Sequence, residues 1–195
     1  MHSASAAPQS LPVAQPALGR RAVEILLGSL LVAICAHIAV PLWFTPVPIT
    51  LQTFAVLLLG LVLSPGLAAS ALVLYLLEGM AGLPVFSPVG SAGFLHLFGP
   101  TGGYLLSYPA AAALTGILRR RLTSSVRNGF AASLLAAAIG SALILLAGAA
   151  WFSVFTRQSA ATAITLAVAP FLPGDTLKVI AAAGAAGALR RFRRS

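Results

Sequence analysis

The sequence predicts an all-α integral membrane protein with six transmembrane helices, and composition is the first reason. Hydrophobic residues make up 59% of the 195 residues and charged residues only 8%, whereas a soluble domain carries about 25% charged residues. The mean hydropathy is +0.99. A chain with so few charged side chains cannot cover a surface that faces water, so we expect a lipid bilayer around most of it.

The distribution of basic residues is the second reason. The net charge is +9, but the arginines occur in short clusters between apolar runs and do not form the basic surface that nucleic acid requires. We therefore expect no nucleic-acid partner. The single cysteine, Cys35, excludes an internal disulfide bond and a cysteine-based metal site.

Apolar runs give the order of the predicted elements. Residues 1–19 contain no Asp, Glu, Lys or Arg and are rich in Ala, Ser, Pro and Gln. They predict a disordered cytoplasmic tail before a six-helix transmembrane substrate-binding domain over residues 20–195. The six predicted spans cover residues 22–40, 50–63, 67–80, 102–118, 131–155 and 175–189.

The connections between these spans differ in character. Three prolines between residues 41 and 48 predict a rigid extended connection, and Ser-Pro-Gly at 64–66 predicts a tight turn. Residues 82–99 form a long loop with several glycines. The apolar run 160–172 contains Pro170 and is too short to cross a membrane.

Basic residues predict the orientation. With six spans, one face holds Arg20 and Arg21, the arginines within 119–127 and the C-terminal arginines, which are ten of the twelve basic residues. Only Arg157 and Lys178 remain for the other face. Because cytoplasmic loops carry the excess of Lys and Arg, both termini are predicted to be cytoplasmic, in a multi-pass protein of the cytoplasmic membrane.

This topology places irregular backbone at the outer face. Irregular backbone at membrane depth persists only where protein or a water-filled cavity satisfies its polar groups, and helices broken by Gly and Pro recur in membrane substrate sites. We therefore expect an outward-facing substrate pocket capped by the loop between helices 3 and 4. The polar residues at the outer ends of spans are His37, Glu78, Tyr104, Asp175 and Lys178.

Asp175 and Lys178 are the only Asp and the only Lys in the chain. Three residues apart on a helix, their side chains share one face. An ionisable pair within a membrane span is a hypothesis of function by default. The alternative is a structural ion pair that fixes the helix to its neighbours.

Four sequence blocks, in order, carry a family resemblance. They are PVPITLQTF (46–54), YLLEGMAGLPVF (75–86), GPTGGY (99–104) and PGDTLK (173–178). Together they resemble the BioY family, the biotin-binding S components of energy-coupling-factor (ECF) transporters, and the resemblance runs over about residues 21–194.

The resemblance implies a bacterial membrane subunit that captures biotin with high affinity for transport. The family partners a transmembrane coupling subunit and two cytoplasmic ATPase subunits, and it has no enzyme activity and no cofactor. The chain itself has no phosphate-binding glycine loop followed by Lys, so it cannot hydrolyse ATP by that mechanism.

Substrate contacts are expected along these blocks. Asp175 would accept from the ureido N–H groups of biotin, and Lys178 would donate to the ureido carbonyl or orient Asp175. Glycine before Tyr104 allows close approach of backbone N–H groups to a ligand. Glu78 is protonated or pairs with Lys178. The expected substrate-binding residues are Asp175, Lys178, Tyr104, Gln52, Thr53, Gly102, Gly103 and Glu78.

Two contacts stay open. Some family members have a basic residue directly after Gly-Gly-Tyr, where this chain has Leu105. The biotin carboxylate is then expected to bind backbone amides, water, or hydroxyls such as those of Ser87 and Ser91. In the first span, Ser29 and Ala33 are small residues four apart. They either dock the coupling subunit or pack inside the bundle.

Other functions are weighed against this one. A small membrane-embedded enzyme needs a nucleophile with a base, or paired metal ligands. The chain has three His, one Cys, three acidic residues and no His-Glu-x-x-His pattern, so we expect no catalytic residue and no metal site. A capture subunit for another vitamin would share the architecture and differ only in the pocket.

Overall fold

The computed structural model describes residues 18–126 and 128–192. The predicted disordered tail therefore lies outside the described residues, apart from residues 18 and 19, which begin the first helix. The helices are α1 (Leu18–His37), α2 (Gln52–Val62), α3 (Pro65–Met80), α4 (Phe94–Leu97), α5 (Gly102–Ser125), α6 (Gly129–Thr156), α7 (Ala160–Ala167), the 3-10 helix η1 (Ala169–Phe171) and α8 (Leu172–Phe192), and the strands are β1 (Ala39–Leu42) and β2 (Thr45–Thr50).

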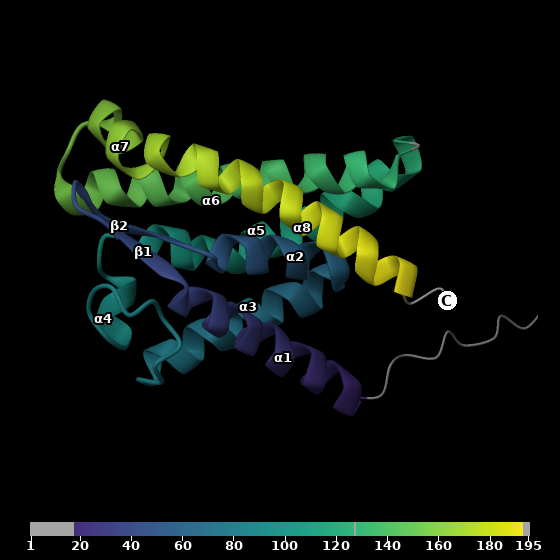
Figure 1. Cartoon of the computed structure of the whole chain (residues 1–195). Helices are drawn as coiled ribbons and strands as arrows, with labels where there is room; N and C mark the ends of the chain where they lie inside the picture. Colours follow the sequence, from purple (N-terminus) through teal and green to yellow (C-terminus); the bar gives the residue numbers. More distant parts are fainter. Residues whose placement is uncertain (1–17, 127, 193–195) are drawn as a thin grey trace, which may run out of the picture.

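The long helices form one bundle around α2 (Figure 1). Helix α1 packs on α3, α3 on α5, α5 on α6, and α6 on α8, while α2 contacts all five. Nearly every residue of α2 is buried, including Gln52 and Thr53. A helix that is apolar on all sides belongs inside a bundle. The first turn of α2 therefore presents its two polar side chains to the interior.

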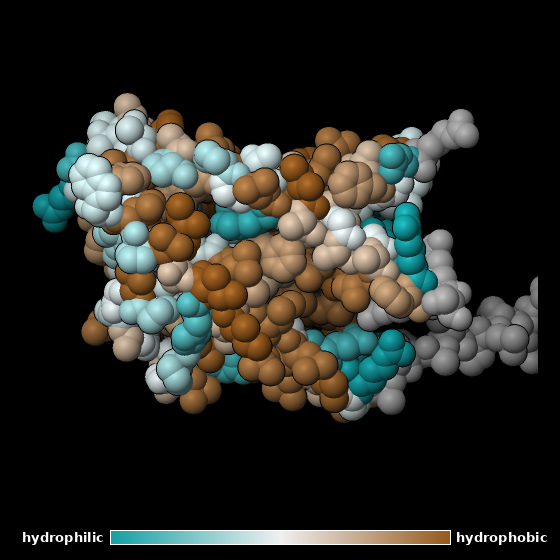
Figure 2. Space-filling model, in the orientation of Figure 1, coloured by the Kyte–Doolittle hydropathy of each residue, from teal (hydrophilic) through white to brown (hydrophobic). Residues whose placement is uncertain are grey.

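The two ends of the bundle differ. The β-hairpin, α4 and α7 lie at one end, which we call the hairpin end, and the N-terminus of α1, the α5–α6 connection and the C-terminal turns of α8 lie at the other, the arginine end (Figure 1). Figure 2 shows hydrophobic residues across much of the middle of this face, with hydrophilic residues mainly toward its ends.

The proline-rich connection is extended, as predicted, but it also pairs with itself. Strands β1 and β2 form an antiparallel hairpin in which Val40 opposes Ile49 and Leu42 opposes Thr45. The all-α prediction is wrong for these ten residues. Each strand of a two-stranded hairpin has one open edge, where proline loses no ladder hydrogen bond.

Helix boundaries correct two further predictions. Helix α5 continues through Arg119, Arg120 and Arg121 to Ser125, although the arginines were expected in a connection. Helix α8 begins at Leu172 rather than at Asp175. Pro173 and Gly174 lie in its first turn, where a backbone N–H has no intrahelical acceptor, so the N–H that proline lacks is not missed. Pro173 and Gly174 therefore do not interrupt a helix; they start α8 directly after η1.

Two stretches of the described residues are both long and apolar enough to cross a membrane by themselves. They are Gly129–Thr156 and Ala160–Phe192, the latter joining α7, η1 and α8. Helices α2 and α3 are apolar but shorter, and α1 and α5 carry arginines within the helix. The fold is therefore a mostly helical bundle with apolar helices of unequal length.

Candidate functional site

A cavity of about 40 Å³ lies at the hairpin end, beneath the loop that joins α3 to α5. Five of the eight predicted site residues line it, and Gly102, Gly103 and Glu78 do not. The lining residues are Val47, Pro48, Thr50, Gln52, Thr53, Ser87, His96, Thr101, Tyr104, Leu105, Tyr108, Leu145, Phe171, Asp175 and Lys178. Elements far apart in the sequence therefore meet here.

Asp175 is the polar centre of this cavity. It lies in the first turn of α8 and is only 5% exposed. Lys178 Nζ donates to Asp175 Oδ1 over 2.9 Å, and Thr53 Oγ1 donates to the same oxygen over 3.4 Å. Ser141 Oγ, on α6, donates to Oδ2 over 3.1 Å. The carboxylate thus joins three helices.

The Asp175–Lys178 pair is almost fully desolvated. The side chains are 6% and 11% exposed, respectively. Burying a charge pair is costly unless further hydrogen bonds satisfy it, and Thr53 and Ser141 supply such bonds to the carboxylate. The Lys178 ammonium group has three N–H donors and uses one of them for Asp175. Because Lys178 borders the cavity, the other N–H groups are left for a ligand. The pair can therefore offer a ligand both an acceptor and a donor.

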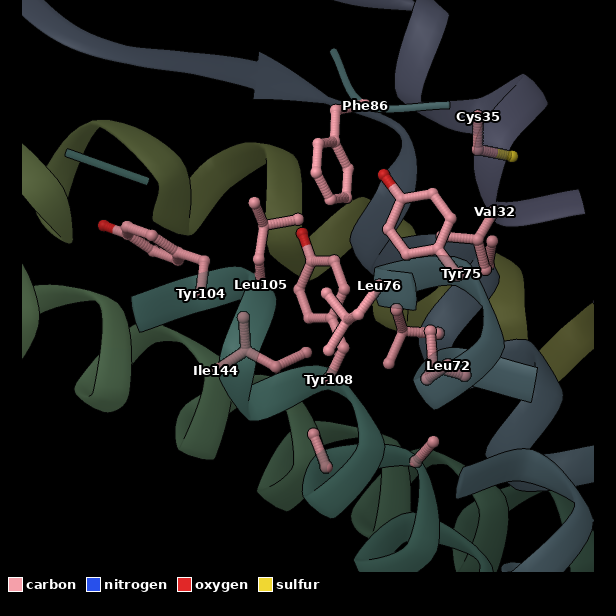
Figure 3. Close-up of a cluster of buried hydrophobic side chains, with 14 of the residues drawn as sticks. Val32, Cys35, Leu72, Tyr75, Leu76, Phe86, Tyr104, Leu105, Tyr108 and Ile144 are labelled. Carbon is pink, nitrogen blue, oxygen red and sulfur yellow. The ribbon is translucent and has the colours of Figure 1, made fainter. Parts of the chain in front are cut away.

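Gln52 organises a second polar group at the start of α2. Its Nε2 donates to the Tyr75 hydroxyl over 2.6 Å. Its Oε1 accepts from Thr50 over 3.1 Å and from the Tyr108 hydroxyl over 3.3 Å. Figure 3 shows Tyr75 and Tyr108 on neighbouring helices with Phe86 beside them. The amide is held in one orientation by these bonds.

Tyr104 is positioned by packing. Its hydroxyl donates to the Ala167 carbonyl at the end of α7, and its ring lies against Phe171 with the centroids 6.3 Å apart. One turn along α5, Tyr108 reaches Gln52. The apolar face of Tyr104 is what remains for a ligand, since its polar tip is already bonded.

Gly102 and Gly103 serve close packing. A Cβ at Gly102 would lie 1.9 Å from the Leu97 carbonyl oxygen. At Gly103 it would lie 2.2 Å from Trp151 Cβ and 2.6 Å from the Ala147 carbonyl oxygen. These two glycines therefore let α5 approach α4 and α6, and they lie outside the cavity lining.

Glu78 also lies outside the cavity. Its observed partner is Ser29, whose Oγ donates to Glu78 Oε2. Lys178 pairs with Asp175 instead. Ser29 and Ala33 are 0% and 7% exposed. Between the two interpretations of these small residues, the structure favours internal packing, because a buried face cannot dock a partner.

Several polar residues of the site were not predicted, among them Tyr108, His96 and Ser141. Tyr108 could have been found from the sequence, because it lies four residues after Tyr104 on the same helix face. His96 lies in the loop between α3 and α5, where the sequence alone gives it no role, yet it is 4% exposed, stacks on Phe86 and donates through Nδ1 to the Ser91 carbonyl over 2.6 Å. Ser141 is one serine in a long apolar helix, and nothing in the sequence distinguishes it.

Comparison with known proteins identifies the family of this chain. The family model described as "BioY family" matches residues 8–195. The chain is 34% identical to "Biotin transporter BioY2" of Lactococcus lactis, over 80% of this chain and 82% of that protein. It is 35% identical to "Probable biotin transporter BioY" of Pyrococcus horikoshii, over 83% and 93% of the two chains.

One solved structure shares the fold. It is the crystal structure of an S-component for biotin from an ECF-type ABC transporter, which superposes with a TM-score of 0.80 at 24% identity. The match covers 91% of this chain and 92% of the other. This structure shows the fold, and the family model together with the curated relatives shows that the chain belongs to the BioY family.

Proposed function

We propose that this chain captures biotin and carries it across the cytoplasmic membrane as the substrate-specific subunit of an ECF-type ABC transporter. The observation that carries the proposal is the buried Asp175–Lys178 pair beside a cavity at the hairpin end. Convergent polar groups beside an otherwise apolar cavity are typical of a small-molecule site, and an ionisable pair within a membrane span is a hypothesis of function by default. Family membership and the names of the relatives identify the substrate.

The ureido ring fits the Asp175 end. Its N–H groups are donors and its carbonyl is an acceptor, which complements a carboxylate beside an ammonium group. Thr53 and Ser141 fix the carboxylate, so little side-chain freedom is lost when the ligand binds. The apolar ring carbons would lie against Tyr104 and Leu145, which line the same cavity.

We place the carboxylate of biotin under the capping loop, residues 82–99, which joins α3 to α5. His96 and Ser87 line this part of the cavity, and Ser87 already accepts from the Val89 N–H through its hydroxyl oxygen. Because His96 Nδ1 donates to the Ser91 carbonyl, the second ring nitrogen, Nε2, donates to a carboxylate only when the imidazole is doubly protonated. In that form His96 would replace the basic residue that the sequence lacks at Leu105.

The capping loop must move when the ligand enters. A cavity of about 40 Å³ is far below the roughly 300–1,000 Å³ of small-molecule sites. Gly82, Gly90 and Gly93 have positive φ angles, so the loop turns at positions that favour glycine. The loop rather than the bundle is the part whose displacement admits a bicyclic ligand.

Testing the substrate requires the purified protein in detergent and a panel of labelled vitamins. We expect saturable binding of biotin and none of riboflavin, thiamine or folate; preference for another vitamin would reassign the chain to a different capture subunit.

The panel includes biotinamide, which lacks the carboxylate. His96→Phe keeps a ring beside Phe86 but removes the ring nitrogens, so it should weaken biotin about tenfold and leave biotinamide unchanged. Equal loss for both ligands would remove His96 from the acid end.

The proposed topology has six membrane-spanning helices, α1, α2, α3, α5, α6 and α8, with both termini in the cytoplasm. It is supported by the ten basic residues assigned to the arginine end. The hairpin end, with the cavity, then faces outward. A transmembrane coupling subunit and two ATPase subunits would bind from the cytoplasmic side and supply the energy for uptake, while biotin binding needs none of them.

Reporter fusions test this topology. Fusions after Arg127 and after Arg194 should both report the cytoplasm, because arginines flank both positions. A fusion after Arg157, in the α6–α7 connection, should report the outside. Opposite locations for the first two fusions would contradict the six-span arrangement.

A further inference from the structure

A second, larger cavity lies at the arginine end. It is a groove of about 970 Å³ between the α5–α6 connection and the last turns of α8, which Figure 1 shows at the same end of the bundle. The groove is far from Asp175 and plays no part in the proposed biotin site. It is lined by Arg119, Thr123, Asn128, Gly129, Phe130, Gly184, Gly187, Ala188, Arg190, Arg191 and Phe192.

Guanidinium groups converge on one side of this groove. Arg119 Nε and Arg190 Nη2 both donate to Ser133 Oγ, over 3.3 Å and 3.1 Å. Arg191 is exposed at the rim. Two like charges held at one hydroxyl favour an anion beside them.

The acidic side chains of the protein are engaged elsewhere. The chain has three. Glu24 pairs with Arg20 over 3.0 Å on α1, Asp175 pairs with Lys178, and Glu78 accepts from Ser29. The positive field of the groove therefore attracts an anion from outside the chain.

The other side of the groove is apolar and open. Gly184, Gly187 and Ala188 on α8 line it, as does Phe130 at the start of α6. A Cβ added at Gly184 or at Gly187 would meet no atom within 4 Å. The glycines thus leave a hollow along α8 that no side chain of the described residues fills. A ligand that suits the whole groove has an anionic head and a hydrocarbon tail.

We propose that this groove binds an anionic phospholipid, with its phosphate beside Arg119 and Arg190, Arg191 at the rim, and an acyl chain along Gly184 and Gly187. Basic pockets between membrane helices on the cytoplasmic side suit such headgroups. The proposed topology enters only in naming the cytoplasmic leaflet. An acidic segment of a partner subunit would satisfy the arginines but would leave the apolar hollow uncovered, so the lipid is the better fit.

Thermal unfolding in neutral detergent tests the proposal. Phosphatidylglycerol at saturation should raise the Tm by roughly 5 °C, whereas phosphatidylcholine and inorganic phosphate should leave it nearly unchanged. Two variants should lose most of this shift. Arg191→Gln removes a cation at the rim, and Gly184→Leu keeps every charge but fills the open hollow. Arg157→Gln, at the opposite end of α6, is the matched control and should keep the full shift.

Each contrary outcome has a definite meaning. An equal shift with phosphatidylcholine would show general lipid solvation, and an equal shift with inorganic phosphate would show a simple anion site; either overturns the proposal. A full shift in both groove variants also overturns it. If Arg191→Gln keeps the lipid shift but loses retention of the coupling subunit, the groove is a protein-docking surface instead. Biotin affinity, measured on the same samples, should not change, so this inference and the biotin proposal can fail separately.

Discussion

Asp175→Asn is expected to lower biotin affinity ten- to a hundredfold while the protein still folds. A hydrogen bond to a charged group contributes about 1.5–3 kcal/mol, and each 1.4 kcal/mol is about tenfold in affinity. Asparagine has the same shape, and its oxygen can face Lys178 and Thr53. Its NH₂ group would face Ser141, whose hydroxyl can accept instead of donate. The substitution therefore removes the charge and one acceptor while each hydrogen bond keeps a partner; the Lys178 ammonium loses its counter-ion, so some loss of Tm is expected beside the loss of affinity.

Lys178→Ala should cost at least as much affinity and should also reduce stability. It leaves the Asp175 carboxylate, with a side chain only 6% exposed, without its cation. The double variant with Asp175→Asn should recover part of the lost Tm, because no buried charge remains. Arg157→Ala is the control for binding. Normal biotin binding in the Asp175 and Lys178 variants, with a lowered Tm, would make the pair structural only.

Gly103→Ala is expected to lower the Tm by roughly 3–10 °C. The added Cβ would lie 2.2 Å from Trp151 Cβ and 2.6 Å from the Ala147 carbonyl oxygen, so α5 and α6 must separate. Overpacking of this kind costs about 1–3 kcal/mol, and each kcal/mol shifts the Tm by about 2–4 °C in a protein of this size.

Gly187→Ala provides the comparison. Gly187 is also a helical glycine, but a Cβ there would meet nothing within 4 Å, so the Tm should stay unchanged or rise slightly. Thermal unfolding of both variants, with biotin binding at a temperature where both are folded, separates packing from ligand contact. An unchanged Tm with lost biotin binding in Gly103→Ala would show that Gly103 belongs to the substrate site.

The polar centre of the site could be predicted because its residues are rare in this chain. A single Asp and a single Lys, three apart in a span, stand out in any membrane helix. Gln52 and Thr53 could be predicted for a similar reason, because they are polar residues at the start of an otherwise apolar run. Ser141 could not be predicted, because its role depends on how α6 packs beside α8, which no local pattern reveals.

The missed features depend on contacts between distant segments. Whether a glycine faces a ligand or a neighbouring helix is decided by what lies opposite, and for Gly103 that is Trp151. The pairing of Glu78 with Ser29 joins α3 to α1 across the bundle. The sequence predicts an extended segment where the β-hairpin forms, but it does not predict the pairing, because prolines suit both a rigid connection and an open strand edge.

Isothermal titration of biotin into the purified chain, alone in detergent, tests the central claim most directly. The account predicts one saturable site per chain without any ATPase or coupling subunit, and affinity lowered ten- to a hundredfold in Asp175→Asn. A folded protein that takes up no biotin, or that binds it equally well after Asp175→Asn and Lys178→Ala, would contradict the account.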